Sequence, residues 1–203
     1  MELDDETGAL LVTLARSTVE KFLAEGILQD PPKEHLAVLE TKAGAFVTIN
    51  SLVNGGKALR GCIGFPNPDK PLIEAVMSAA VSAATEDPRF TPLTRNELDK
   101  VVFEVSVLTP PELIQVRSPK ELPGNIDVGR DGLIVRWPLG GGLLLPQVPV
   151  EYGWGAEEFL ENACVKAGAT PDSWLLPSTK IYKFQAMIFE EASPSGGVEK
   201  KYL

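Results

Sequence analysis

The sequence predicts an α+β fold in which helices pack on a mostly antiparallel β-sheet. Amphipathic stretches with helical spacing alternate with strand-like runs of apolar residues, and several of these runs are joined by short glycine-rich turns. Hairpins pair their strands antiparallel, and the chain contains no long linker. We therefore predict one domain over residues 7–191, with a division into two lobes as an alternative, and a flexible C-terminal tail over residues 192–203.

Length, composition and charge limit the classes of function. The chain has 203 residues, 44% of them hydrophobic, and a chain of this length buries roughly 70% of its unfolded surface without help from disulfides or metals. It has no run of 18 or more apolar residues, and its acidic start lacks the apolar region of a secretory signal. These features predict a cytoplasmic protein that does not contact a membrane.

The charge balance argues against nucleic-acid binding. The chain carries 28 acidic and 19 basic side chains, a formal net charge of -9. Proteins that bind a phosphate backbone draw much of their affinity from Lys and Arg. We therefore expect no nucleic-acid partner.

Two helices are predicted in the first half of the chain. In residues 8–25 the apolar side chains recur at a spacing of 3.6, and Gly26 is placed to end that helix. Residues 71–86 repeat the pattern with many alanines, which favours close helix packing. Pro71 is tolerated in a first turn, and Asp69 is the predicted cap of this second helix.

A β-hairpin is predicted between these helices. Residues 44–53 are rich in β-branched and aromatic side chains. Asn54, Gly55 and Gly56 tolerate positive φ and favour a turn back into the sequence KALRGCIGF. Cys62 is therefore expected at the end of the second strand, in a glycine-flanked turn.

The helices and strands after residue 90 are also predicted from short sequence patterns. Thr94 and Glu97 match a capping box and predict a short helix before a strand over residues 101–108. The sequences GLIVRW and GLLLPQV predict a second hairpin around a PLGGG turn. A helix is predicted over residues 155–167 with Gly168 as its C-cap, and KIYKFQAMIFEE predicts a long final strand.

The chain has few residues that bind transition metals. Its cysteines are Cys62 and Cys164, its one histidine is His35, and their spacing matches no zinc motif. We predict no metal site built from these residues and no cofactor, while an all-oxygen site for a hard cation stays open. Cys164 falls on the apolar face of a predicted helix and is expected to be structural.

Four blocks of sequence resemble one known family. LRGCIG at residues 59–64 resembles the signature hexapeptide of the AMMECR1 family, and DPRF at 87–90, LLPQVPVEYGW at 144–154 and FLENACVKAG at 159–168 follow in that family's order. The resemblance covers residues 7–191. It implies an AMMECR1-like α+β fold and an intracellular location, without implying a reaction. Related prokaryotic domains are associated with or fused to Memo-like and radical-SAM proteins, which implies a protein partner in a shared pathway.

The resemblance also implies candidate site residues. The family's prominent positions correspond here to Arg60, Gly61, Cys62, Gly64, Asp87, Arg89, Gln147 and Trp154.

Cys62 is the candidate nucleophile, with Arg60 or Arg89 as the group that activates it. Gly61 and Gly64 allow positive φ or a close approach of the backbone, and they leave the thiol unshielded. A free thiol is only about 3% ionised at pH 7, and a guanidinium at about 5 Å supplies roughly the 2 kcal/mol needed to make it half ionised. The alternatives are binding without chemistry, or a small buried side chain in a structural turn.

The other candidates have two interpretations each. Asp87 and Arg89 predict either a polar ligand site or an ion pair, and Gln147 and Trp154 either line a cleft or, for Trp154, belong to the core. Two classes of function remain open. The first is an enzyme or small-molecule-binding domain with a pocket between the two halves near Arg60, Cys62, Arg89 and Gln147; the second is a non-catalytic protein-interaction or scaffold module. The exposed chemistry of the hexapeptide slightly favours the first class, and an oligomer is compatible with either.

Overall fold

The computed structural model describes residues 3–32, 37–53 and 55–201 and confirms the predicted α+β fold with antiparallel strands. The chain divides into two compact units. The first contains the described residues up to Leu108 and those from Met187 onward, and the second is Thr109–Ala186. No helix in the described parts of the chain has both the length and the apolar character needed to cross a bilayer.

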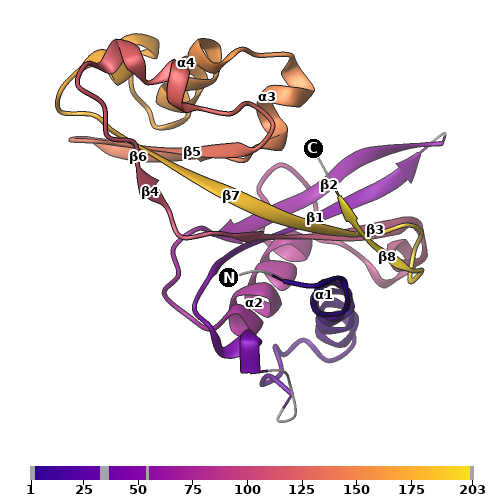
Figure 1. Cartoon of the computed structure of the whole chain (residues 1–203). Coiled ribbons are helices and arrows are strands. Elements are labelled where there is room, and N and C mark those ends of the chain that lie inside the picture. The colour runs from indigo at the N-terminus through magenta and orange to yellow at the C-terminus, as the bar shows by residue number, and fades with distance from the viewer. Residues whose placement is uncertain (1–2, 33–36, 54, 202–203) are drawn as a thin grey trace. The chain divides into compact units, whose positions relative to one another are not determined.

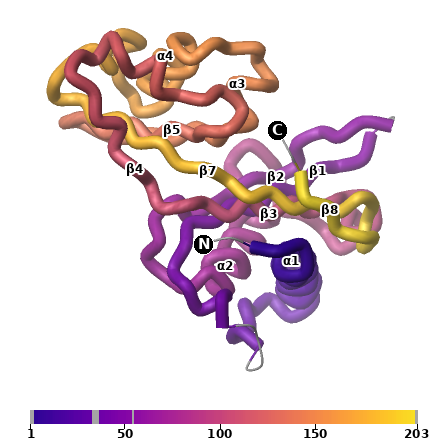
Figure 2. The backbone as a smooth tube through the Cα atoms, viewed as in Figure 1, coloured from indigo at the N-terminus to yellow at the C-terminus, as the bar shows by residue number. Residues whose placement is uncertain are grey.

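The first unit is built on an antiparallel sheet (Figures 1 and 2). In order across the sheet its strands are β2 (Gly56–Phe65), β1 (Gly44–Val53), β3 (Val101–Leu108) and the second half of β7 (Lys180–Glu191), with β8 (Val198–Lys201) paired to β7. Figure 2 shows β3 and this part of β7 side by side. Strand β2 is therefore the terminal strand of the path, and the LRGCIG segment lies on it.

Two helices cover one face of this sheet, α1 (Asp5–Glu25) and α2 (Leu72–Thr85) (Figure 1). Both were predicted, and Gly26 has the positive φ of 75° expected of a helix-ending glycine. The prediction that Asp69 caps α2 is wrong. Pro71 occupies the cap position and no side chain caps it, because Asp69 lies two residues too early to reach the free N–H groups.

The core of the first unit is made by the apolar faces of these elements. Its fully buried side chains come from α1, α2, β1, β3 and β7, and they include Leu11, Val19, Ala79, Phe103, Val105 and Phe189. The alanines of α2 let its backbone approach the sheet closely. The result is a rigid support under β1 and β2.

The second unit contains a smaller sheet and two α-helices. Its strands are β4 (Glu112–Leu113), β5 (Asp131–Trp137), β6 (Gly140–Leu144) and the first half of β7, and its α-helices are α3 (Gln147–Tyr152) and α4 (Ala156–Lys166). The predicted hairpin, helix and long strand are confirmed, and Gly168 has φ of 77° after α4.

Two local predictions in the second unit are wrong. Gly140–Gly142 were assigned to a turn but begin β6, where a Cβ on Gly142 would lie 2.5 Å from the backbone nitrogen of Ala167. The glycines therefore allow the end of α4 to contact the strand. Gln147 was assigned to a strand but begins α3, because Pro146 and Pro149 have no N–H for a ladder and are tolerated at a helix start.

The C-terminal tail predicted to be flexible contains a strand. Val198–Lys201 form β8 antiparallel to β7, and the Lys201 ammonium lies 2.8 Å from the buried carboxylate of Glu190. Strand β8 forms because its backbone pairs with β7 and its Lys201 pairs with Glu190. Neither partner can be predicted from the sequence SPSGGVEKK itself. Residues 202–203 lie outside the described residues.

Candidate functional site

The LRGCIG segment lies inside strand β2 and not in a turn. Cys62 is paired with Thr48, and the ladder continues through Gly64 opposite Phe46 to Phe65 opposite Ala45. The expectation that Cys62 ends the strand is wrong, because the ladder between β1 and β2 continues beyond Cys62 to Phe65. Asn54, predicted in the hairpin turn, lies outside the described residues.

Arg60 is the extra residue of a β-bulge. The ladder pairs Gly61 with Ile49 but Leu59 with Asn50, so Arg60 has no opposite residue on β1. A bulge redirects the side chain of the extra residue. Here the Arg60 guanidinium donates hydrogen bonds to the Glu97 carboxylate at 2.8 Å and to the carbonyl of Thr91 at 2.8 Å.

Glu97 anchors this arrangement. Its carboxylate also accepts hydrogen bonds from the backbone N–H and the hydroxyl of Thr94, which confirms the predicted capping box at the start of the short 3-10 helix η2 (Arg95–Lys100). The hydrogen bonds from Arg60 are the largest reason why the pKa of Glu97 falls to about 2. The charge of Arg60 is therefore directed at Glu97.

The two glycines beside Cys62 serve close packing. Neither has positive φ. A Cβ on Gly61 would lie 2.1 Å from the backbone oxygen of Ala83 in α2, and a Cβ on Gly64 would lie 2.2 Å from the ring of Phe46. Gly61 and Gly64 were predicted to allow either positive φ or a close approach of the backbone, and the structure shows the close approach.

Asp87 and Arg89, which follow α2, bind the backbone of Cys62, and we call this pair the edge clamp. The Cys62 N–H donates to Asp87 Oδ2 at 2.8 Å, and Arg89 Nη2 donates to the Cys62 carbonyl at a long 3.4 Å. Arg89 also donates to both carboxylate oxygens of Asp87, at 2.9 and 2.7 Å. On a terminal strand these are the backbone groups that another strand would pair with. The clamp therefore closes the sheet edge at Cys62.

The two opposite charges of the edge clamp, on Asp87 and Arg89, form an ion pair with each other. The Asp87 side chain is 2% exposed and the Arg89 side chain 54% exposed. The hydrogen bonds from Arg89 hold the pKa of Asp87 well below its usual range, and the Cys62 N–H contributes in the same direction. The ion-pair interpretation of these two residues is confirmed.

The thiol of Cys62 is not activated by this arrangement. Burial raises the pKa of Cys62, and this outweighs the opposing effects of a hydrogen bond from Thr48 and of the Arg89 charge. The direction is opposite to the one that the nucleophile hypothesis requires.

Cys62, Thr48 and Glu104 lie side by side on the sheet face opposite α2, and we call them the Cys62 row. Gly61 faces α2, so its neighbour Cys62 faces the other way. Thr48 is paired with Cys62 on one side and with Glu104 of β3 on the other, and its hydroxyl donates to Cys62 Sγ at 3.3 Å. Thr48 and Glu104 were not predicted as site residues, because only the pairing of three strands brings them beside the thiol.

The remaining candidates belong to the second unit. Gln147 begins α3, and Trp154 follows α3 and packs against the core of this unit, with its ring stacked on Tyr152 at a centroid distance of 4.8 Å. Cys164 is fully buried in α4, and burial raises its pKa to about 11. Its structural role is confirmed.

The described residues contain no cluster of side chains that could form a metal site. Within the described ranges, no group of three or more His, Cys, Asp or Glu side chains is arranged to hold a metal ion. His35 lies outside those ranges.

The chain is similar over its whole length to proteins of one family. The AMMECR1 family matches residues 12–189. A protein of Thermofilum pendens is 52% identical over 207 residues, covering 99% of this chain and 97% of its own length, and Protein PH0010 of Pyrococcus horikoshii is 53% identical over 203 residues, covering 100% and 98%. The crystal structure of PH0010, titled as an uncharacterized protein, superposes with a TM-score of 0.95 at 53% identity and covers both chains completely. This chain therefore belongs to the AMMECR1 family.

Proposed function

We propose that this chain is a binding module that holds a small polar molecule on the Cys62 row without covalent chemistry at Cys62. The observation that carries the proposal is the edge clamp. Arg89, the cation nearest to the thiol, is paired with Asp87, and the Arg60 guanidinium is paired with Glu97. Burial outweighs the effect of the Arg89 charge and raises the pKa of Cys62, so the thiol stays protonated near neutral pH.

The chemistry of the row defines the ligand class. A neutral thiol and a hydroxyl both donate and accept hydrogen bonds, and a carboxylate accepts them. The three side chains sit next to one another on rigid strands, each partly exposed. A ligand with hydroxyl or amino groups complements this set.

Alkylation of the two cysteines tests the absence of thiol chemistry. Native protein is treated with iodoacetamide between pH 6 and pH 10, and labelling is read by mass spectrometry. We expect Cys62 to label slowly, with an apparent pKa above the ordinary value of about 8.5, and Cys164 to label only after unfolding. Fast labelling of Cys62 with an apparent pKa well below 8 would support the nucleophile hypothesis instead.

The same assay at pH 9 tests binding. Pools of hydroxyl- and amine-bearing metabolites are added, and a ligand on the row should slow the labelling of Cys62. Thr48→Val removes a hydroxyl from the row and should abolish that protection, whereas Thr179→Val, in the second unit, should leave it intact. If no pool slows labelling, the small-molecule proposal fails.

A protein-interaction role is the second candidate, and exposed apolar side chains at the end of the β1–β2 hairpin favour it. Leu52, Val53 and Leu59 are 42%, 50% and 41% exposed. So few side chains fall far short of the roughly 800 Å² that each partner of a stable complex buries. They fit a short extended segment of a partner protein with alternating apolar side chains.

Selection from a displayed peptide library tests this second candidate. We expect peptides with alternating apolar residues to be enriched on the native protein and lost on the Leu52→Glu/Leu59→Glu variant. Leu139→Glu, which changes an 82% exposed leucine of the second unit, is the matched control and should keep the enrichment. Equal enrichment on all three proteins would exclude the hairpin as the docking surface.

A further inference from the structure

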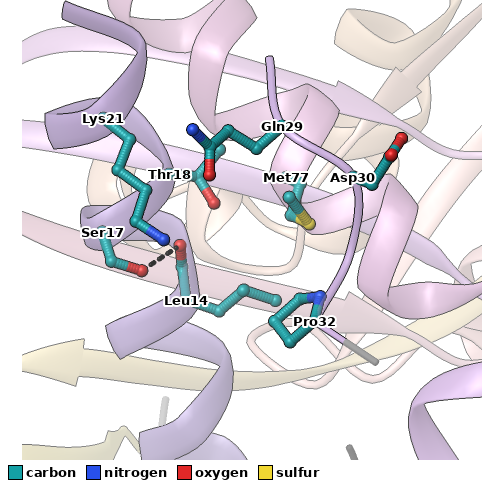
Figure 3. Close-up of a pocket in the computed structure, with 8 residues that line it drawn as sticks. All are labelled: Leu14, Ser17, Thr18, Lys21, Gln29, Asp30, Pro32 and Met77. Carbon is teal, nitrogen blue, oxygen red and sulfur yellow. Dashed lines mark hydrogen bonds between the residues drawn. The ribbon is translucent and has the colours of Figure 1, made fainter. Parts of the chain in front are cut away.

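A pocket of about 230 Å³ lies against α1 in the first unit (Figure 3). It is lined by Leu14, Ser17, Thr18, Lys21, Gln29, Asp30, Pro32 and Met77. These residues come from α1, the segment that follows it and α2. The pocket is thus on the helical side of the unit, away from the face that carries the Cys62 row.

Thr18 brings a hydroxyl to this pocket. The residue is only 5% exposed, and no hydrogen bond of its hydroxyl is found among the described residues. Two other helical threonines bond within their helix: Thr13 donates to the carbonyl of Ala9 and Thr85 to that of Val81, both at 2.8 Å. The Thr18 residue lines the pocket, and a hydroxyl both donates and accepts hydrogen bonds, so Thr18 is suited to bind a polar group that enters the pocket.

Lys21 brings a positive charge to the same place. It lies three residues after Thr18 on α1, which puts both side chains on one side of the helix. No carboxylate in the described part of the chain forms an ion pair with its ammonium group. In Figure 3 the Lys21 ammonium lies beside Ser17 and the Leu14 carbonyl, the Thr18 hydroxyl lies next to the Gln29 side chain, and Asp30 lies on the other side of the view.

The rest of the lining is half apolar, from Leu14, Pro32 and Met77, and half polar, from Ser17, Gln29 and Asp30. Leu14 and Met77 line the pocket from α1 and α2, and Pro32 closes it from the segment after α1 (Figure 3). The Lys21 ammonium and the Thr18 hydroxyl suit an anionic head, and the three apolar side chains suit an apolar chain joined to it. The Asp30 carboxylate, which also lines the pocket, repels an anion, so the head group is placed on Lys21 and Thr18 and away from Asp30.

We propose that this pocket binds a small organic carboxylate, with its carboxylate on Lys21 and Thr18 and its apolar chain against Leu14, Met77 and Pro32. A water molecule occupies about 30 Å³, so the pocket has room for a ligand of about six to eight non-hydrogen atoms. The net charge of -9 does not prevent this, because salt screens distant charges beyond about 8 Å while the Lys21 contact is direct. The proposal is independent of the Cys62 row.

Titration with sodium pentanoate, which has seven non-hydrogen atoms, tests the proposal. We expect saturable shifts of the backbone amides of residues 14–21 in ¹H–¹⁵N correlation spectra. Lys21→Met should weaken binding about 10- to 100-fold, the loss expected for a hydrogen bond between charged groups. Thr18→Val should also weaken it, and Thr18→Ser, which keeps the hydroxyl, should restore it.

Two controls separate this site from general effects. Lys166→Met changes an exposed lysine of the second unit and should bind pentanoate as the unchanged protein does, and 1-pentanol, which lacks the carboxylate, should cause no saturable shift. Because Lys21 is exposed, its variant should fold, so it decides the matter even if Thr18→Val does not fold. Unchanged spectra at 50 mM pentanoate, or equal affinity in Lys21→Met, would overturn the proposal.

Discussion

Replacing Arg16 by Met is expected to lower the free energy of unfolding by about 3–5 kcal/mol. Arg16 on α1 and Glu191 on β7 form an ion pair with side chains only 7% and 3% exposed. The guanidinium also donates to the carbonyls of Leu98 and Val101, at 3.0 and 2.8 Å. Without it, the buried Glu191 carboxylate loses its charged partner, and two backbone carbonyls lose a hydrogen-bond donor.

Urea denaturation followed by circular dichroism measures this effect, with the slope of the transition compared between variants. A second substitution separates the loss of contacts from the burial of an unpaired charge. Glu191→Gln removes the charge while its amide oxygen still accepts the N–H of Phe103, which Glu191 accepts at 3.0 Å. Arg16→Met/Glu191→Gln should therefore be more stable than Arg16→Met alone. A loss below about 1 kcal/mol in Arg16→Met would mean that the pair adds no more than an exposed one.

Replacing Asp87 by Ala is expected to lower the free energy of unfolding by about 2–4 kcal/mol. The change removes the acceptor of the Cys62 N–H and the partner of Arg89. It also reopens the edge of β2, so the variant should aggregate more readily than the unchanged protein. Denaturation and light scattering measure the two consequences.

The pH dependence of the free energy of unfolding tests whether the ionised carboxylate of Asp87 stabilises the fold. The folded protein holds the pKa of Asp87 below its usual value of about 3.9. Its contribution is therefore complete above that value and is lost as the pH falls through the lower, folded pKa. Stability should fall between about pH 4 and pH 2 in the unchanged protein and fall less in Asp87→Asn. Asp127→Asn, at a side chain 69% exposed, should retain the full pH dependence; an Asp87→Asn profile that matches it would show that the clamp carboxylate is not stabilised.

Much of the fold could be predicted from the sequence because its signals are local. The spacing of apolar side chains located α1, and β1 and β3 have the predicted bounds of residues 44–53 and 101–108. Gly26 ends α1 with positive φ, as its position predicts, whereas the predicted C-cap Gly168 has positive φ one residue beyond the actual C-cap of α4, Ala167. Each of these features depends on the preferences of a few consecutive residues.

The candidate site was only partly predictable. The hexapeptide could be recognised as unusual, and Asp87 and Arg89 were singled out with it, but the direction of each side chain was not available. Arg60 points to Glu97 because a bulge redirects it, and Arg89 points to Asp87. Thr18 and Lys21 were assigned to an amphipathic helix, and only the segment that folds over that helix makes a pocket beside them.

The sequence by itself determined the α+β class, the order of most helices and strands, and the family to which the chain belongs. Tertiary structure alone decided that Cys62 lies in mid-strand, that its backbone is held by residues 25 and 27 positions away, and that burial raises the pKa of its thiol. The physical reason is that a strand ends where its partner ends, and a thiol ionises according to the groups that surround it. Both depend on residues far apart in the chain, which only the folded protein brings together.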